Sequence, residues 1–272
     1  MTAWHGSTDL KEEAVALMQR HRAQDEFRLG NYVKANSEMA SGFQGCFHGC
    51  LTAEKIAAEF GIFPGQLTMH LGEEWWSETE RIWGIPVALN RLLDDLFECA
   101  PDYGTGAMFA TSTVEAIPVG ADLSRINDLW TYDALVVSPF SPIGLALTQE
   151  ARTLLEAATS RIASRLQGNQ VPHDEVLFQR AAAAMREAEA RTSWADDDDA
   201  VNNCLTHEIV CAITSRDVIN DYQSVARSLS EMWKWHASPE QYAQVAGQTW
   251  WGWSVNNLLS HLAKAPVLTS VS

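Results

Sequence analysis

The stretches GFQGCFHGCL at residues 42–51 and WGIPVALNRLLDDLFE at residues 83–98 bound the segment around which this chain is organised. The segment gathers thiol, imidazole, carboxylate and indole side chains. Thiolates, imidazoles and carboxylates bind metal ions and transfer protons, so they are the groups that a chemical site requires. We therefore expect any chemical site of this protein to lie within residues 42–98.

Cys46, His48 and Cys50 form the first candidate site. Thiolate and imidazole are preferred zinc ligands, and Gly45 and Gly49 let the turn approach a ligand or another backbone closely. The spacing C-x-x-x-C differs, however, from the C-x-x-C pairs of structural zinc sites, and no second cysteine pair follows at a matching distance. We therefore favour a tight glycine turn whose small cysteines pack in the core, with metal binding as the alternative.

A carboxylate cluster is the second candidate. Its members are Glu73, Glu74, Glu78, Glu80, Asp94, Asp95 and Glu98. Asp94 and Glu98 are four residues apart, so on a helix they share one face and repel each other unless a cation or a proton intervenes. Arg91 is spaced to form a local ion pair with Asp94 or Asp95. Paired carboxylates bind metals or act as acid and base, whereas a solvated acidic face is the simpler explanation. The absence of a Glu-x-x-His repeat argues against a di-iron bundle.

Cys204, His207 and Cys211 form the third candidate, because on a helix they lie on one face together with Glu208. The pattern differs from the H-E-x-x-H motif of zinc proteases, since Cys211 stands where the second histidine would be. Buried free cysteine is common, so we favour packing over metal binding here as well.

Helical periodicity runs through most of the chain and predicts an all-α protein. The predicted helices cover residues 10–27, 73–83, 109–116, 148–165, 174–194 and 201–235, with others starting at Thr52, Pro86, Asp122 or Ser124, and Ser238. The run Ser138-Pro139-Phe140-Ser141-Pro142 predicts a boundary. We expect an irregular N-terminal helical unit, residues 1–137, packed on a C-terminal helical bundle, residues 143–272, as two domains or as one continuous domain.

The charge balance excludes several classes of partner. With 35 acidic against 19 basic residues, the formal charge of −16 weakens attraction to phosphate backbones and anionic membranes. We therefore expect no nucleic acid and no membrane as partner, and no apolar run has the length of a transmembrane helix. No G-x-G-x-x-G or G-x-x-x-x-G-K-[ST] loop points to a nucleotide cofactor. Five cysteines in 272 residues predict free thiols in a reducing cytoplasm.

Three segments together resemble a group of uncharacterised bacterial and phage proteins. They are the turn at residues 45–51, the GIP…LDDLFE helix at residues 84–98 and EAIPVGADLS at residues 115–124. The Trp4-His5-Gly6 segment fits the same group, whose members end in Ala-rich helices. In the group the turn usually reads G-C-A-x-G-C, whereas here Phe47 and His48 stand in its middle. The resemblance extends over about residues 4–135. It implies an architecture, a bacterial or phage origin and a cytoplasmic setting, but no reaction.

Two functions from different classes follow. An acidic chain with 11 tryptophans and no complete catalytic motif fits an accessory protein that binds a partner protein, such as a phage factor that binds a host protein, and we favour this slightly. The alternative is a small-molecule enzyme or metal-binding protein with a pocket at the Cys46–Cys50 turn. Its candidate residues are Cys46, His48, Cys50, His70, Glu80, Asp94 and Glu98. Convergence of a cysteine with a carboxylate of residues 83–98 would favour the alternative.

Overall fold

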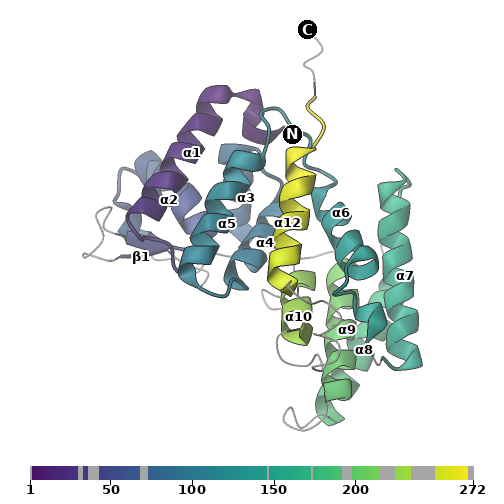
Figure 1. The fold of residues 1–272 in the computed structure, drawn as a ribbon. Helices are drawn as coiled ribbons and strands as arrows, with labels where there is room; N and C mark the ends of the chain where they lie inside the picture. Colours follow the sequence, from purple (N-terminus) through teal and green to yellow (C-terminus); the bar gives the residue numbers. More distant parts are fainter. Residues whose placement is uncertain are drawn as a thin grey trace. The chain divides into compact units, whose positions relative to one another are not determined.

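The computed structural model describes residues 2–29, 33–35, 43–67, 73–145, 147–172, 174–191, 198–214, 224–233 and 249–268. Helices dominate these residues, so the predicted all-α class is confirmed (Figure 1). The strands within the described ranges are β1 (Val33–Ala35) and β2 (Phe43–Gly45), which pair antiparallel with Lys34 opposite Gln44. This short pairing was not predicted, because three residues are too few to show the alternation of a strand.

The chain divides into two compact units. The first unit combines Met1–Asn127 with Val255–Ser272, and the second is Asp128–Ser254. The predicted boundary at residues 138–142 therefore lies inside the second unit. The last helix, α12 (Trp250–Ala263), contains the point at which the chain returns to the first unit.

Five α-helices between residues 8 and 116 make up most of the described first unit. They are α1 (Thr8–Ala23), α2 (Phe47–Phe60), α3 (Glu73–Trp83), α4 (Val87–Glu98) and α5 (Tyr103–Ala116), joined by the 3-10 turns η1 (Ala3–Gly6) and η2 (Pro64–Gln66). Helix α4 packs against α2, α3 and α5, and α1 packs against α2 and α5. Helical spacing predicts an apolar stripe along one face of α4, and this stripe is buried. The stripe consists of Leu89, Leu92, Leu93, Leu96 and Phe97. Helix α4 is thus the central support of this unit.

Several predicted helix starts were wrong. Helix α1 begins at Thr8 and not at the predicted residue 10, because the Ser7 side chain caps it by accepting a hydrogen bond from the Leu10 N–H. Helix α1 also ends at Ala23, before the predicted Phe27. Helix α2 begins at Phe47 and not at Thr52, so the glycine–cysteine turn is the first turn of a helix. Helix α5 begins at Tyr103 and not at the predicted residue 109.

The ends of the described chain meet the segment 115–124 in the first unit. The Ala3 N–H donates to the Ala121 carbonyl, and the Gly120 N–H donates to the Ala3 carbonyl. The Asp122 N–H donates to the carbonyl of Pro266, near the other end of the chain. These backbone hydrogen bonds, together with one from the Trp4 indole N–H to the Ile117 carbonyl at 3.1 Å, hold three remote segments together.

The second unit is built around α9 (Asp198–Thr214), which packs against α7 (Gln149–Leu166), α8 (Glu175–Arg191) and α10 (Val225–Glu231). Helix α6 (Ile126–Tyr132) continues into a π-helical turn, η3 (Asp133–Val137), and η4 (Pro142–Gly144) precedes α7. Thr148 caps α7 as the predicted start of that helix requires. The predicted helix 201–235 corresponds to α9 and α10, and residues 215–223 lie outside the described ranges. So does the predicted helix start at Ser238.

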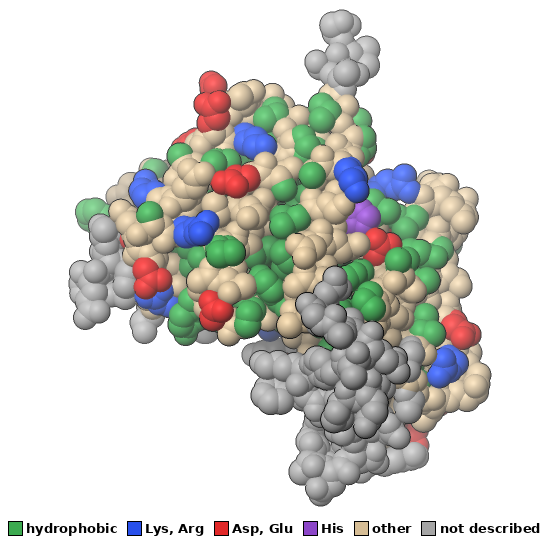
Figure 2. All heavy atoms as spheres, viewed as in Figure 1, with side chains coloured by type: hydrophobic (Ala, Val, Ile, Leu, Met, Phe, Trp, Pro, Cys, Tyr) green, Lys and Arg blue, Asp and Glu red, His purple; other side chains and the backbone are tan. Residues whose placement is uncertain are grey.

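Charged side chains of both signs are present on one face of the molecule. Lys and Arg side chains lie interspersed with Asp and Glu side chains on the face shown in Figure 2. No described helix has both the length and the apolar character that crossing a bilayer requires.

Candidate functional site

The Gly45–Gly49 pair brings strand β2 against the start of helix α2. A Cβ atom on Gly45 would lie 3.1 Å from the Gly49 Cα and 3.3 Å from the Cys50 nitrogen. The Gly45 N–H donates to the Glu26 carbonyl, and the Gly45 carbonyl accepts from the Arg28 N–H. The two glycines therefore act as predicted, in allowing a close backbone approach, and they fix the position of the intervening Cys46.

Cys46 is the N-cap residue of α2, and its side chain is fully buried. Its backbone is extended, with φ −70° and ψ −170°, and its carbonyl accepts the first helical hydrogen bond, from the Cys50 N–H at 2.9 Å. Cys50 is equally buried and lies one turn further along α2, where its thiol contacts the Gly45 carbonyl at 3.5 Å. The two cysteines therefore face different surroundings.

The Cys46 thiol lies beside two carboxylates of α4. One ligand atom from each of Cys46, Asp94 and Glu98 lies within 4.8 Å of the other two. Asp94 is buried, and Glu98 is half-buried one turn further along the helix. The predicted common face of Asp94 and Glu98 is thus confirmed, and it is directed toward a cysteine from another helix. No other group of three potential ligands was found among the described residues.

The electrostatics of this group favour a positive charge. Burial raises the pKa of the Cys46 thiol well above its usual value, and the Asp94 and Glu98 carboxylates raise it further, while the Gly49 N–H acts in the opposite direction. A thiolate here would lie among like charges in a region of low polarity. A cation between the three groups would remove that penalty.

His48 and Glu80 lie outside this group. The His48 Nε2–H donates to the Asn90 carbonyl at 2.7 Å, so the imidazole ties α2 to α4. A Glu80 carboxylate oxygen accepts from the Val87 N–H at 3.4 Å, at the start of α4, where the helix dipole favours a negative charge. The Arg91 guanidinium lies over the Trp76 ring, 5.8 Å from its centroid. His70 lies outside the described residues, as do the side chains of Glu73 and Glu74.

His48 should make the stability of the first unit depend on pH. Burial lowers its pKa from the usual 6.5 to about 4, and the hydrogen bond to the Asn90 carbonyl opposes this only in part. Between these two pKa values the unfolded chain binds a proton that the folded chain does not, so stability falls as the pH falls. From pH 7 to pH 4 we expect wild type to lose about 3 kcal/mol relative to His48→Gln, which keeps a donor for Asn90. Urea unfolding in EDTA measures this difference, and parallel pH profiles of the two proteins would contradict it.

The third candidate group does not converge. Cys204, His207 and Cys211 lie buried on α9, but their ligand atoms do not come within 4.8 Å of one another as a group. Burial lowers the pKa of His207, which favours its neutral form, and raises that of Cys211 to about 11. The burial of all three residues is what the packing interpretation expects.

A histidine–carboxylate cluster escaped the sequence analysis. His21 Nδ1 lies 2.5 Å from a Glu26 carboxylate oxygen, and His21 Nε2 lies 3.5 Å from the Glu54 carboxylate. His21 and Glu26 are fully buried, whereas Glu54 is half-buried at the edge of a pocket. Glu54 lies one turn beyond Cys50 on α2. A predicted helix that began at Phe47 would have placed Glu54 on the same face as Cys50.

No protein-family model, curated protein or solved structure gives a significant match to this chain. The resemblance to a group of bacterial and phage proteins therefore stays a prediction. All three segments that carry it lie in the first unit.

Proposed function

We propose that this protein binds a single divalent metal ion through Cys46, Asp94 and Glu98. The observation that supports the proposal best is the convergence of these three ligand atoms, within 4.8 Å, from two helices. The two carboxylates project from one face of α4, and the thiol is presented by the start of α2. A bound cation would link these two helices and neutralise negative charge in the interior.

The ligand set selects the kind of metal. A thiolate is a soft ligand and a carboxylate a hard one, and Zn²⁺ accepts both, whereas Mg²⁺ and Ca²⁺ take oxygen ligands. We therefore propose Zn²⁺ as the preferred ion. Zinc usually takes four ligands, so three protein ligands leave one position for a water or a substrate atom. A small-molecule enzyme would use that position for its chemistry.

A zinc titration of the full-length protein tests the proposal. Protein stripped with EDTA and then desalted is titrated with Zn²⁺ in competition with a chromophoric chelator. We expect one Zn²⁺ per chain, and Cys46→Ser and Glu98→Gln should each weaken binding by at least about 100-fold, because loss of a direct ligand should cost more than loss of a supporting residue. An excess of Mg²⁺ should not displace the zinc.

Cys50→Ser is the matched control, since Cys50 is as buried as Cys46 and lies in the same helix outside the convergent group. It should retain the zinc affinity of the wild type. Absence of stoichiometric zinc, or equal affinities for Cys46→Ser and wild type, would sink the proposal.

The setting and the partner are also proposals. A thiolate ligand requires reduced cysteine, and all five cysteines are free, so a reducing cytoplasm is the setting that we propose. We also propose that the protein binds a partner protein. The exposed apolar residues Ile62 and Phe63, just after helix α2, support this separately.

A further inference from the structure

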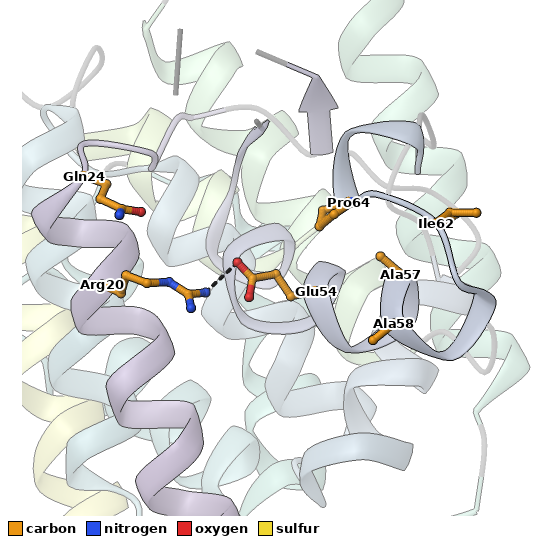
Figure 3. Close-up of a pocket in the computed structure, with 7 residues that line it drawn as sticks. All are labelled: Arg20, Gln24, Glu54, Ala57, Ala58, Ile62 and Pro64. Carbon is orange, nitrogen blue, oxygen red and sulfur yellow. Dashed lines mark ion pairs between the residues drawn. The ribbon is translucent and has the colours of Figure 1, made fainter. Parts of the chain in front are cut away.

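A pocket of about 440 Å³ lies between the ends of helices α1 and α2 (Figure 3). Figure 3 shows Arg20 and Gln24 on the α1 side, opposite the residues from α2 and the turn that follows it. The lining residues are Arg20, Gln24, Glu54, Ala57, Ala58, Ile62 and Pro64. None of these residues belongs to the proposed metal site.

The polar side of the pocket contains the Glu54 carboxylate, which Arg20 and the buried His21 contact. Glu54 Oε1 pairs with Arg20 at 2.5 Å and lies 3.5 Å from the buried His21 Nε2. No hydrogen bond to His21 Nε2 was found in the described part of the chain, and His21 is itself anchored to Glu26. Within the described ranges both contacts of Glu54 use Oε1, and its side chain is 29% exposed, so Oε2 can accept a hydrogen bond from a ligand in the pocket.

Two helix C-termini meet at this pocket. Arg20 lies in the last turn of α1 with Gln24 as the C-cap, and Ala57 and Ala58 lie in the last turn of α2. The C-terminal end of a helix has a partial negative charge of about half an elementary charge, and so favours a cation. Arg20 lines the pocket too and already pairs with Glu54, so an entering cation would share this carboxylate with Arg20. The two helix ends would add a favourable negative partial charge.

The other side of the pocket is apolar and continues onto the surface. Ala57, Ala58, Ile62 and Pro64 offer a wall for a hydrocarbon chain. Phe60 and Phe63, which alternate with Ile62 and Pro64 along the chain, are 71% and 76% exposed. Two aromatic side chains with so much exposed surface beside a pocket are typical of a surface that binds a protein.

We propose that this pocket binds the arginine side chain of a partner protein. The guanidinium would donate to the free Glu54 oxygen, its aliphatic stem would lie on the alanine wall, and apolar neighbours in the partner would contact Phe60 and Phe63. A formal charge of −16 attracts a basic partner at long range. The exposed phenylalanines favour a protein segment over a small amine, because a small amine has no group to cover them.

Methyl NMR of the full-length protein tests the proposal with three probes. The Ile62 methyl signal, assigned with Ile62→Leu, reports on the pocket. N-acetyl-arginine amide should shift this signal in a saturable way, whereas the uncharged N-acetyl-citrulline amide should not. A capped pentapeptide, Leu-Ser-Arg-Ser-Leu, should bind at least about tenfold more tightly than the single arginine, since it also covers the phenylalanines.

Variants separate the two halves of the proposal. Glu54→Gln should weaken both arginine probes by at least about tenfold, whereas Phe60→Ser with Phe63→Ser should remove only the additional affinity of the peptide. Glu12→Gln, which removes an exposed carboxylate of α1 outside this pocket, is the matched control and should change nothing. Equal shifts with arginine and citrulline, or binding that survives Glu54→Gln, would overturn the arginine site. Equal affinities for the peptide and the single arginine would overturn the proposal that the ligand is a protein segment.

Discussion

Gly84→Ala is expected to lower the free energy of unfolding of the first unit by about 4 kcal/mol. Gly84 follows α3 with φ +69°, a left-handed conformation that costs an L-residue about 1–2 kcal/mol. A Cβ atom there would also lie 2.3 Å from the Thr2 carbonyl oxygen and 3.2 Å from the His5 nitrogen. Both neighbours are backbone atoms, which cannot move aside as the end of a side chain does. Urea unfolding followed by tryptophan fluorescence measures the loss.

Gly61→Ala is the matched control for this experiment. Gly61 follows α2 with φ +64°, and a Cβ atom there would have nothing within 4 Å. The control therefore carries the conformational cost alone, about 1–2 kcal/mol. If the two substitutions cost the same, the close approach of the Gly-Ile-Pro turn to residues 2–5 would be contradicted.

The fold was predictable from the sequence where helical periodicity decides it. Helix α3 begins and ends where the pattern predicted, and α4 buries its predicted leucine stripe, because both helices present one apolar face to the core. The start of α2 was missed for the opposite reason. Gly49 in a helix costs about 1 kcal/mol relative to alanine, so the local sequence favours a loop. The close approach of Gly45 to Gly49 explains why both glycines are present. It comes from the packing of β2 against the start of α2, which no local pattern reveals.

The candidate site was predictable only in part. The spacing of Asp94 and Glu98 placed the two carboxylates on one face of a helix, as the structure does. Cys46 lies beside that face because of the way α2 packs on α4. The same packing makes His48 a hydrogen-bond donor to the Asn90 carbonyl and not a member of the candidate metal site. The spacing of Cys46, His48 and Cys50 in the sequence predicts one set of candidate ligands. The start of α2 directs only Cys46 toward the carboxylates, so the turn offers one candidate ligand at this group and not three.

Zinc at about 1,000 times its dissociation constant should raise the free energy of unfolding of the first unit by about 4 kcal/mol. The increase is expected because Cys46 and Asp94 are far apart in the sequence, so the unfolded chain does not hold the ligands together. Thermal and urea unfolding in zinc and in EDTA measure the increase as a difference for each protein, which cancels any effect of a substitution on the metal-free state.

Asp94→Asn should lose most of this zinc-dependent increase, because an uncharged amide is a poor zinc ligand. Glu80→Gln is the control, since Glu80 lies in the preceding helix, α3, and its carboxylate accepts from the Val87 N–H at the start of α4, outside the convergent group. It should show the full increase even if its metal-free stability is lower. An equal increase in Asp94→Asn and wild type would place any zinc elsewhere. An increase that is lost in both variants would mean that zinc responds to the integrity of α4 and not to the Asp94 carboxylate. Only loss in Asp94→Asn with retention in Glu80→Gln fits direct coordination by the carboxylate that faces Cys46.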